Sequence, residues 1–129
     1  MTKFDLGLPA QRFVAAANSL TVDDWTTVVM RGRDLGEKKR ETIGAVENSM
    51  SAAERSALEK RAVQSIGAEF GAALDALPLR VVGQAQTAYE TAVFALQKRD
   101  KLAPEVLRTW FDPFELVGIR LDVLLGEDE

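Results

Sequence analysis

Apolar residues recur along nearly the whole chain at spacings of three and four, which is the pattern of helices that bury one face. Alanine-rich runs strengthen this interpretation, because alanine favours helices over strands. The apolar pattern and the residues at its boundaries together predict a series of helices. They begin near Pro9, Thr21, Gly36, Ser51, Leu79, Pro104 and Pro113.

Two of these helix starts carry capping sequences. Thr21 with Asp24 is a shorter variant of the capping box, and Ser51 with Glu54 is the full box. We predict that the helix after Ser51 is the longest, with its apolar stripe reaching residue 77 before Pro78 ends it. The next helix is predicted from residue 79 to about residue 98, and a connector over residues 101–103 follows it.

The stretch TWFDPFE, residues 109–115, concentrates aromatic side chains around one proline. Asp112 is placed to cap a helix that starts at Pro113, with Glu115 three residues after the cap. Phe111 would then pack on Leu116 as a hydrophobic staple. The pattern predicts a corner between two helices, and a recognition box for a partner is the alternative.

The segment after Pro113 has two interpretations. As a helix, it would place Phe114, Val117, Leu121 and Leu124 along one stripe. As a strand, residues 119–125 would alternate between apolar and other side chains. A lone strand leaves its backbone groups without partners. We therefore predict a helix here, with a strand as the open alternative.

The predicted elements are joined by short connections, with no internal repeat, linker or low-complexity tract. Short connections favour neighbouring helices that run antiparallel. The sequence therefore predicts an all-α fold, a compact bundle of about six or seven helices that are mostly antiparallel neighbours. Residues 1–126 are expected to form one helical domain, followed by a short acidic tail at 127–129.

The composition removes several chemistries. The 129 residues include no cysteine and no histidine, so disulfides, thiolate metal sites and the commonest general base are excluded. Carboxylate metal sites in bundles typically add a histidine, and no phosphate loop or activated nucleophile is recognisable. The sequence indicates no catalytic residue, metal or cofactor, and although an enzyme stays open, nothing in it argues for one.

The expected compartment follows from charge and hydropathy. No segment has the length and apolar character of a signal peptide or a membrane span. The formal net charge of −4 argues against a dedicated nucleic-acid binder. We expect a soluble cytoplasmic protein without a membrane partner.

A basic run occupies residues 31–41. Clustered cations can contact phosphates or nucleic acid. Three acidic residues within the run offset this charge, which is typical of a solvated, self-compensated helix surface. We therefore treat an anion contact as the weaker interpretation. The candidate residues for it are Arg31, Arg33, Lys38, Lys39 and Arg40.

Some apolar residues lie on a second side of their predicted helices. Phe94 stands among polar neighbours, and Leu116, Ile119 and Val123 form a second stripe in the last segment. A helix that is apolar on two sides is either central to its bundle or covered by another subunit. We predict a homodimer on this basis. Gly67 and Gly71, four residues apart, indicate close packing either within the fold or at the same interface.

These observations predict a non-catalytic helical module that binds another protein or assembles with itself, most simply as a homodimer. One alternative is a bundle that binds a small apolar ligand or acts as a regulatory effector domain. Its pocket would be lined by Trp25, Phe70, Tyr89, Phe94, Trp110 and Phe114. The other alternative is a nucleic-acid-associated protein that uses the basic cluster at 31–40.

Overall fold

The computed structural model describes residues 7–48 and 50–126, without the side chains of Lys39, Ile43, Glu47 and Leu58. Within this part of the chain all regular structure is helical, which confirms the predicted fold class. The α-helices are α1 Leu8–Ala17, α2 Val22–Leu35, α3 Glu37–Asn48, α4 Ala52–Gln64, α5 Ala68–Asp75, α6 Leu79–Gln97, α7 Pro104–Glu115 and α8 Leu121–Leu124. A 3-10 turn, η1, covers Arg99–Lys101. No helix in the described residues is long and apolar enough to cross a membrane.

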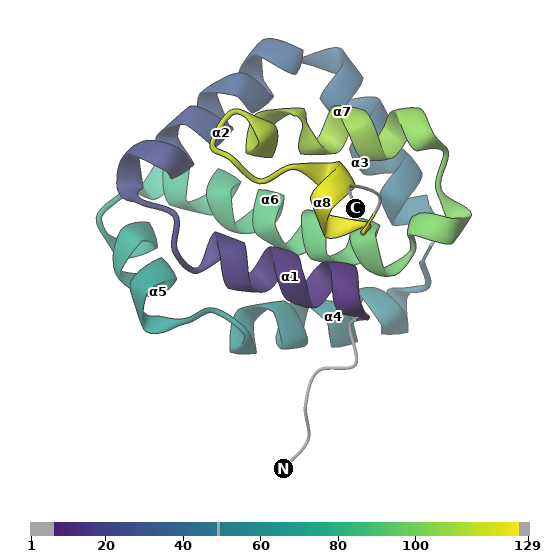
Figure 1. The fold of residues 1–129 in the computed structure, drawn as a ribbon, viewed down its shortest axis with the longest axis horizontal. Helices are drawn as coiled ribbons and strands as arrows, with labels where there is room; N and C mark the ends of the chain where they lie inside the picture. The colour runs from purple at the N-terminus through teal and green to yellow at the C-terminus, as the bar shows by residue number, and fades with distance from the viewer. Residues whose placement is uncertain (1–6, 49, 127–129) are drawn as a thin grey trace.

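Helix α6 runs through the middle of the bundle, with α1 and α7 on its near side in Figure 1 and α4 along its lower edge. It packs against α1, α2, α3, α4, α5 and α7. Four alanines of α6, at positions 85, 88, 92 and 95, are buried, and small side chains let neighbouring helices approach closely. One central helix is therefore enclosed by the rest of its own chain.

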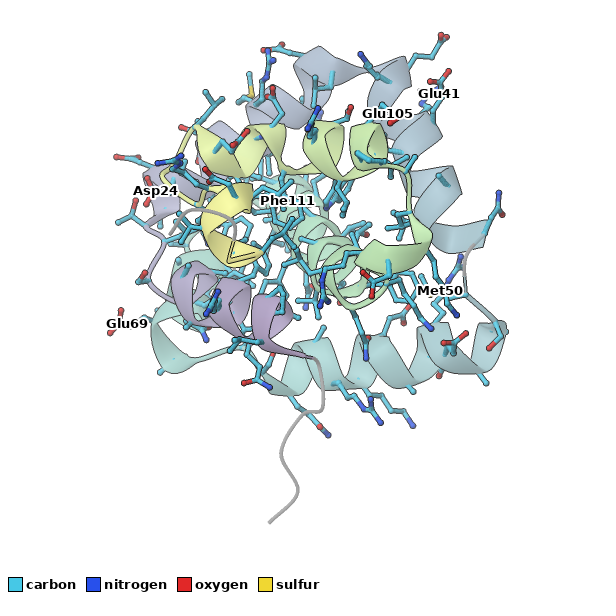
Figure 2. All side chains as sticks on the ribbon, turned by 45° about the vertical axis from the view of Figure 1, so that its right-hand side comes forward. Asp24, Glu41, Met50, Glu69, Glu105 and Phe111 are labelled. Carbon is cyan, nitrogen blue, oxygen red and sulfur yellow. The ribbon has the colours of Figure 1, made fainter. Side chains whose placement is uncertain are left out.

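An aromatic cluster joins the helices around α6. Phe13 of α1 meets Phe111 and Phe114 of α7 edge to face, with ring centroids 5.6 and 5.1 Å apart. Trp25 of α2 stacks on Phe70 of α5 at 4.7 Å with an interplanar angle of 11°. Figure 2 shows Phe111 in the middle of the molecule, while Glu41, Glu69 and Glu105 reach outward. Such ring pairs stabilise by about 0.5–1.5 kcal/mol each beyond the area they bury.

The local signals at helix ends are confirmed. The Thr21 hydroxyl accepts from the Asp24 amide at 3.1 Å, and the Asp24 carboxylate accepts from the Thr21 amide at 3.0 Å. Ser51 and Glu54 form the same reciprocal pair at 3.1 and 3.2 Å. Gly36 ends α2 at a φ of 53°, a conformation that favours glycine. Each of these signals acts within a few residues of the chain, which is why sequence alone could locate it.

The long helix predicted after Ser51 is wrong, because the chain breaks between Gln64 and Ala68. Asn18, the C-cap residue that follows α1, supplies the hydrogen bonds that the break requires. Its Oδ1 accepts from the Gly67 amide at 2.6 Å, and its Nδ2 donates to the Ser65 carbonyl at 3.3 Å. A Cβ at Gly67 would lie 3.1 Å from the Asn18 side chain, so glycine permits this close approach.

The helix corner predicted at TWFDPFE is also wrong. Helix α7 continues to Glu115 with Pro113 inside it, and the Asp112 carboxylate binds Arg31 instead of capping a helix. An interior proline costs a helix about 3 kcal/mol. The edge-to-face contacts of Phe111 and Phe114 with α1 offset this cost. Leu116 is 60% exposed while Phe111 is buried, so the expected staple does not form.

The last segment is helical only in part. After α7 the chain reverses at Gly118, whose φ is 94°, and Arg120 is extended before the single turn of α8. The predicted stripe from Phe114 to Leu124 is therefore divided between α7 and α8. The acidic tail at 127–129 lies outside the described residues.

Replacing Asn18 with alanine should lower the free energy of unfolding by about 1–3 kcal/mol, the usual cost of leaving buried backbone groups without partners. The Gly67 amide and the Ser65 carbonyl are the groups concerned. Urea denaturation measures the loss, and Asn48→Ala at an exposed position in α3 is the matched control. Equal stabilities for the two variants would contradict this account of the break.

Candidate functional site

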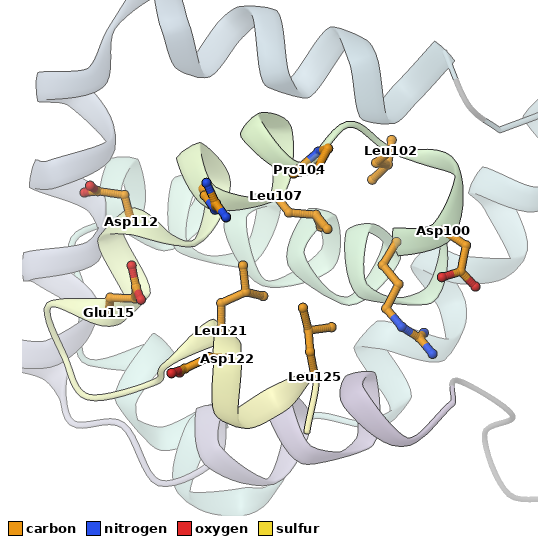
Figure 3. Close-up of a pocket in the computed structure, with 11 residues that line it drawn as sticks. Asp100, Leu102, Pro104, Leu107, Asp112, Glu115, Leu121, Asp122 and Leu125 are labelled. Atoms are coloured by element: carbon orange, nitrogen blue, oxygen red, sulfur yellow. The ribbon is translucent and has the colours of Figure 1, made fainter. Parts of the chain in front are cut away.

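A groove with a volume of about 670 Å³ opens between α7, η1 and α8. Figure 3 shows Leu107 of α7, Leu121 of α8 and Leu125, the C-cap residue of α8, converging on this space. Charged side chains form the rim. The residues that line the groove are Arg99, Asp100, Leu102, Pro104, Leu107, Arg108, Asp112, Glu115, Leu121, Asp122 and Leu125.

The position of α8 determines the width of this groove. The reversal at Gly118 brings the chain back alongside α7, and Ile119 donates its amide to the Phe114 carbonyl at 3.0 Å. On the far side of α8, the guanidinium of Arg12 donates to the carbonyls of Val123 and Leu124 at 3.2 and 3.4 Å. A cation at the C-terminal carbonyls of a helix is favourable. Helix α8 is thus fixed to α1, and its leucines are left facing α7.

The charges at one end of the groove are largely paired. Asp112 accepts from Arg31 at 2.5 and 3.2 Å, and this hydrogen bond is the main cause that raises the pKa of Arg31. Asp122 pairs with Arg120 at 2.5 Å. Asp112, Glu115 and Asp122 lie together at this end in Figure 3, and Asp100 lies at the other. The rim is therefore polar on both sides of an apolar centre, with charges of both signs.

The groove carries no recognisable catalytic arrangement. Within the described residues, no three acidic side chains come together in a way that could hold a metal ion. Four of the aromatic residues considered for a ligand pocket, Trp25, Phe70, Tyr89 and Phe114, are linked by contacts between their rings. A cavity lined by Trp110 and Phe114 has a volume of about 10 Å³, the space of a single water molecule.

The structure separates the residues predicted for an interface. Phe94 is only 1% exposed, and Ile119 is also buried, so neither offers a surface to a partner in this conformation. Leu116 and Val123 are 60% and 47% exposed. Gly67 and Gly71 are half-buried at the α4–α5 break and in α5, and Gly67 is in contact with Asn18.

The basic residues predicted to contact an anion are also separated. Arg31 points to Asp112, which lies 81 positions later in the chain. Arg33 donates toward the Met30 sulfur at 3.8 Å, and Lys38 and Arg40 are exposed on α3. The side chain of Lys39 lies outside the described residues. The long-range ion pair with Asp112 thus directs the side chain of Arg31 away from the other basic residues.

Sequence reasoning missed the groove. Its apolar residues come from two segments that the pattern assigned to a short helix beginning at Pro104 and to one continuous helix after Pro113. The available signal was Gly118 together with Leu121 and Leu125, four residues apart on one side of a short helix. Had Gly118 been interpreted as a turn, the segment would have been divided correctly into the end of α7 and the short helix α8.

A second candidate site is the contact between α4 and α6, a seam that is lined mainly by polar side chains. Two clefts of about 150 and 190 Å³ flank α4, and Phe94 lines both of them. In the first cleft Glu90 of α6 faces Arg55 and Glu59 of α4. Burial, and secondly the charge of Glu59, raise the pKa of Glu90 above its ordinary value of 4.5. The second cleft holds the ion pair between Glu54 and Lys98, at 2.6 Å.

No model of a protein family matches this sequence, and no curated protein and no solved structure shows significant similarity to it.

Replacing Glu90 with glutamine should stabilise the protein at neutral pH. Because its pKa is raised in the folded chain, the folded state binds a proton at Glu90 more readily than the unfolded state does. The charged carboxylate therefore costs stability above the raised pKa, and this cost disappears as the pH falls below the ordinary value of 4.5.

Urea midpoints of the wild type and Glu90→Gln, measured between neutral and acidic pH, test this expectation. The difference should be largest at neutral pH and should vanish in acid. Glu69→Gln, at an exposed site on α5, is the matched control. A difference that grew as the pH fell would contradict the assigned direction.

Proposed function

We propose that the protein is a non-catalytic interaction module and that the groove between α7 and α8 binds a segment of a partner protein. The carrying observation is the convergence of Leu107, Leu121 and Leu125 on an open groove with a polar rim. An apolar centre surrounded by charged residues is the usual organisation of a protein interface. On the sequence grounds given above, the module is expected to work in the cytoplasm.

The groove suits a short amphipathic segment better than an enclosed small molecule. It is open to the outside, and Leu121 and Leu125, which are half-buried, offer apolar contacts to a partner side chain. The charged rim can pair with polar residues on either side of them. Peptide recognition of this kind uses apolar anchors for affinity and charges at the edge for specificity.

Self-assembly is a second form of the same function. Leu116 and Val123 are exposed on the segment that leads into and forms α8. They are the two members of the sequence-predicted stripe that the fold leaves accessible. A two-fold contact between copies would cover them, since such a contact uses the same patch on each subunit. A homodimer through this surface remains our proposal for the assembled state.

Selection of a random peptide display library against the protein tests the groove. Enriched peptides should carry neighbouring apolar residues, and Leu121→Asp should weaken their binding by more than about tenfold, the factor that about 1.4 kcal/mol produces. Arg108→Glu, which changes an exposed rim residue, provides a second groove variant. Leu79→Asp is the matched control, because Leu79 is 90% exposed at the start of α6. Peptides that bind all variants equally would refute the groove as the binding surface.

Light scattering coupled to size-exclusion chromatography tests the homodimer. The wild type should have the mass of a dimer, and Leu116→Glu should shift it to a monomer, because a charge would be buried without a partner at the contact. Leu79→Glu should leave the mass unchanged. A monomeric wild type at high protein concentration would end the homodimer proposal without affecting that of the groove.

A further inference from the structure

Helix α4 lies over Phe94, and its described side chains make little apolar contact with the core. Ala62 is buried, whereas the other described side chains of α4 are exposed. The side chain of Leu58 lies outside the description. No other described residue of α4 belongs to the apolar core or packs against it. By contrast, α6 beneath it buries residues on every side.

The contact between α4 and α6 is unevenly packed and polar. Clefts of about 150 and 190 Å³ run along the two sides of α4, and both reach Phe94. An ion pair between Glu54 and Lys98, whose charged atoms are 2.6 Å apart, connects the N-terminal half of α4 to the end of α6. In the other cleft, Glu59 faces Glu90 across the seam with Arg55 beside them, so two carboxylates share one partly buried space. Apart from the buried Ala62, the described side chains at this contact are therefore mostly polar groups that water can also satisfy.

The C-terminal end of α4 is fixed much more firmly. Asn18 holds the Ser65 carbonyl and the Gly67 amide, and the Ser65 hydroxyl shares a hydrogen bond of 2.5 Å with the buried hydroxyl of Tyr89. These contacts connect residues 65–67 to α1 and α6. At the other end, α4 is held by the ion pair and by Met50, which precedes the N-cap Ser51 and is partly buried against the core. An opening about residues 65–67 therefore has to release both of these contacts.

We propose that α4 is a cover that opens locally about residues 65–67, and that its opening exposes Phe94 on α6. Regions with few buried apolar contacts are those that open without unfolding of the whole domain. A helix α4 that opens would explain two observations on Phe94 that otherwise disagree. Its neighbours on α6 are polar, as on a surface, and yet the side chain is 1% exposed. This inference is independent of the α7–α8 groove.

Thiol labelling in the native state tests the cover, since the chain has no cysteine of its own. Ala62→Cys places a thiol on the buried side of α4, and Ala92→Cys places one at an equally buried position of α6. Under native conditions the thiol at position 62 should react at least about tenfold faster than that at position 92, because it needs only the local opening. The labelling rate at position 62 should also change little when urea is added at low concentrations.

A variant that lacks the ion pair provides a second test of the opening of α4. Lys98→Met removes the ion pair with Glu54 while it keeps most of the side-chain stem. It should speed labelling at position 62 without an equal increase at position 92. Equal rates with the same urea dependence at positions 62 and 92 would overturn the proposal, because α4 would then open only when the whole domain unfolds.

Hydrogen exchange of the unmodified protein decides the question if a cysteine variant does not fold. The amides of residues 52–64 should exchange at least about tenfold faster than those in the middle of α6, in a common opening step. Protection of α4 equal to that of α6 would refute the cover.

Discussion

The C-terminal half of helix α6 can be enclosed on every side because its surface alternates between narrow and bulky residues. Buried alanines form smooth rows against which other helices settle, while Tyr89, Val93 and Leu96 fill the spaces between them. Small residues at a helix contact reduce the distance between axes, and larger ones interlock with the facing helix. The aromatic cluster then joins the outer helices to one another around this centre. Helices α1 to α5 and α7 all pack against α6, and α7 forms one wall of the groove.

The sequence was a good guide at most helix ends with a local cause, although the turn at Gly118 was missed. Capping boxes, the proline before α6 and the proline that opens α7 act within one helical turn, and all of them were found. The other errors have distant causes. Asn18 breaks a helix 49 residues away, and Arg31 removes Asp112 from its expected role as a cap across 81 residues. Periodicity cannot detect such partners, because it describes only which side of a helix is apolar.

The same difference explains the candidate sites. Phe94 and the stripe at residues 116–123 were identified because they violate the pattern of a one-sided helix. The structure explains Phe94 by α4 and Ile119 by burial, and it leaves Leu116 and Val123 exposed. The groove was not identified because neither of its walls violates any pattern. It arises from the distance between α7 and α8, which the turn at Gly118 and the anchor at Arg12 determine. A surface defined by the spacing of two ordinary helices can be seen only once the chain is folded.

The bond between Asn18 and the α4–α5 break has a consequence for how the chain folds. The corner at residues 65–67 has its partners in α1 and α6, so it cannot be completed by its own segment. Closing a loop of this size is entropically unfavourable until several contacts form together. The first helix and the middle of the chain must therefore associate in the same step. A fragment that begins after Asn18 would have the sequence of α4 and α5 but would lack the side chain that bonds the turn between them, so the residue that ends α1 acts as a folding determinant for a corner remote from it in sequence.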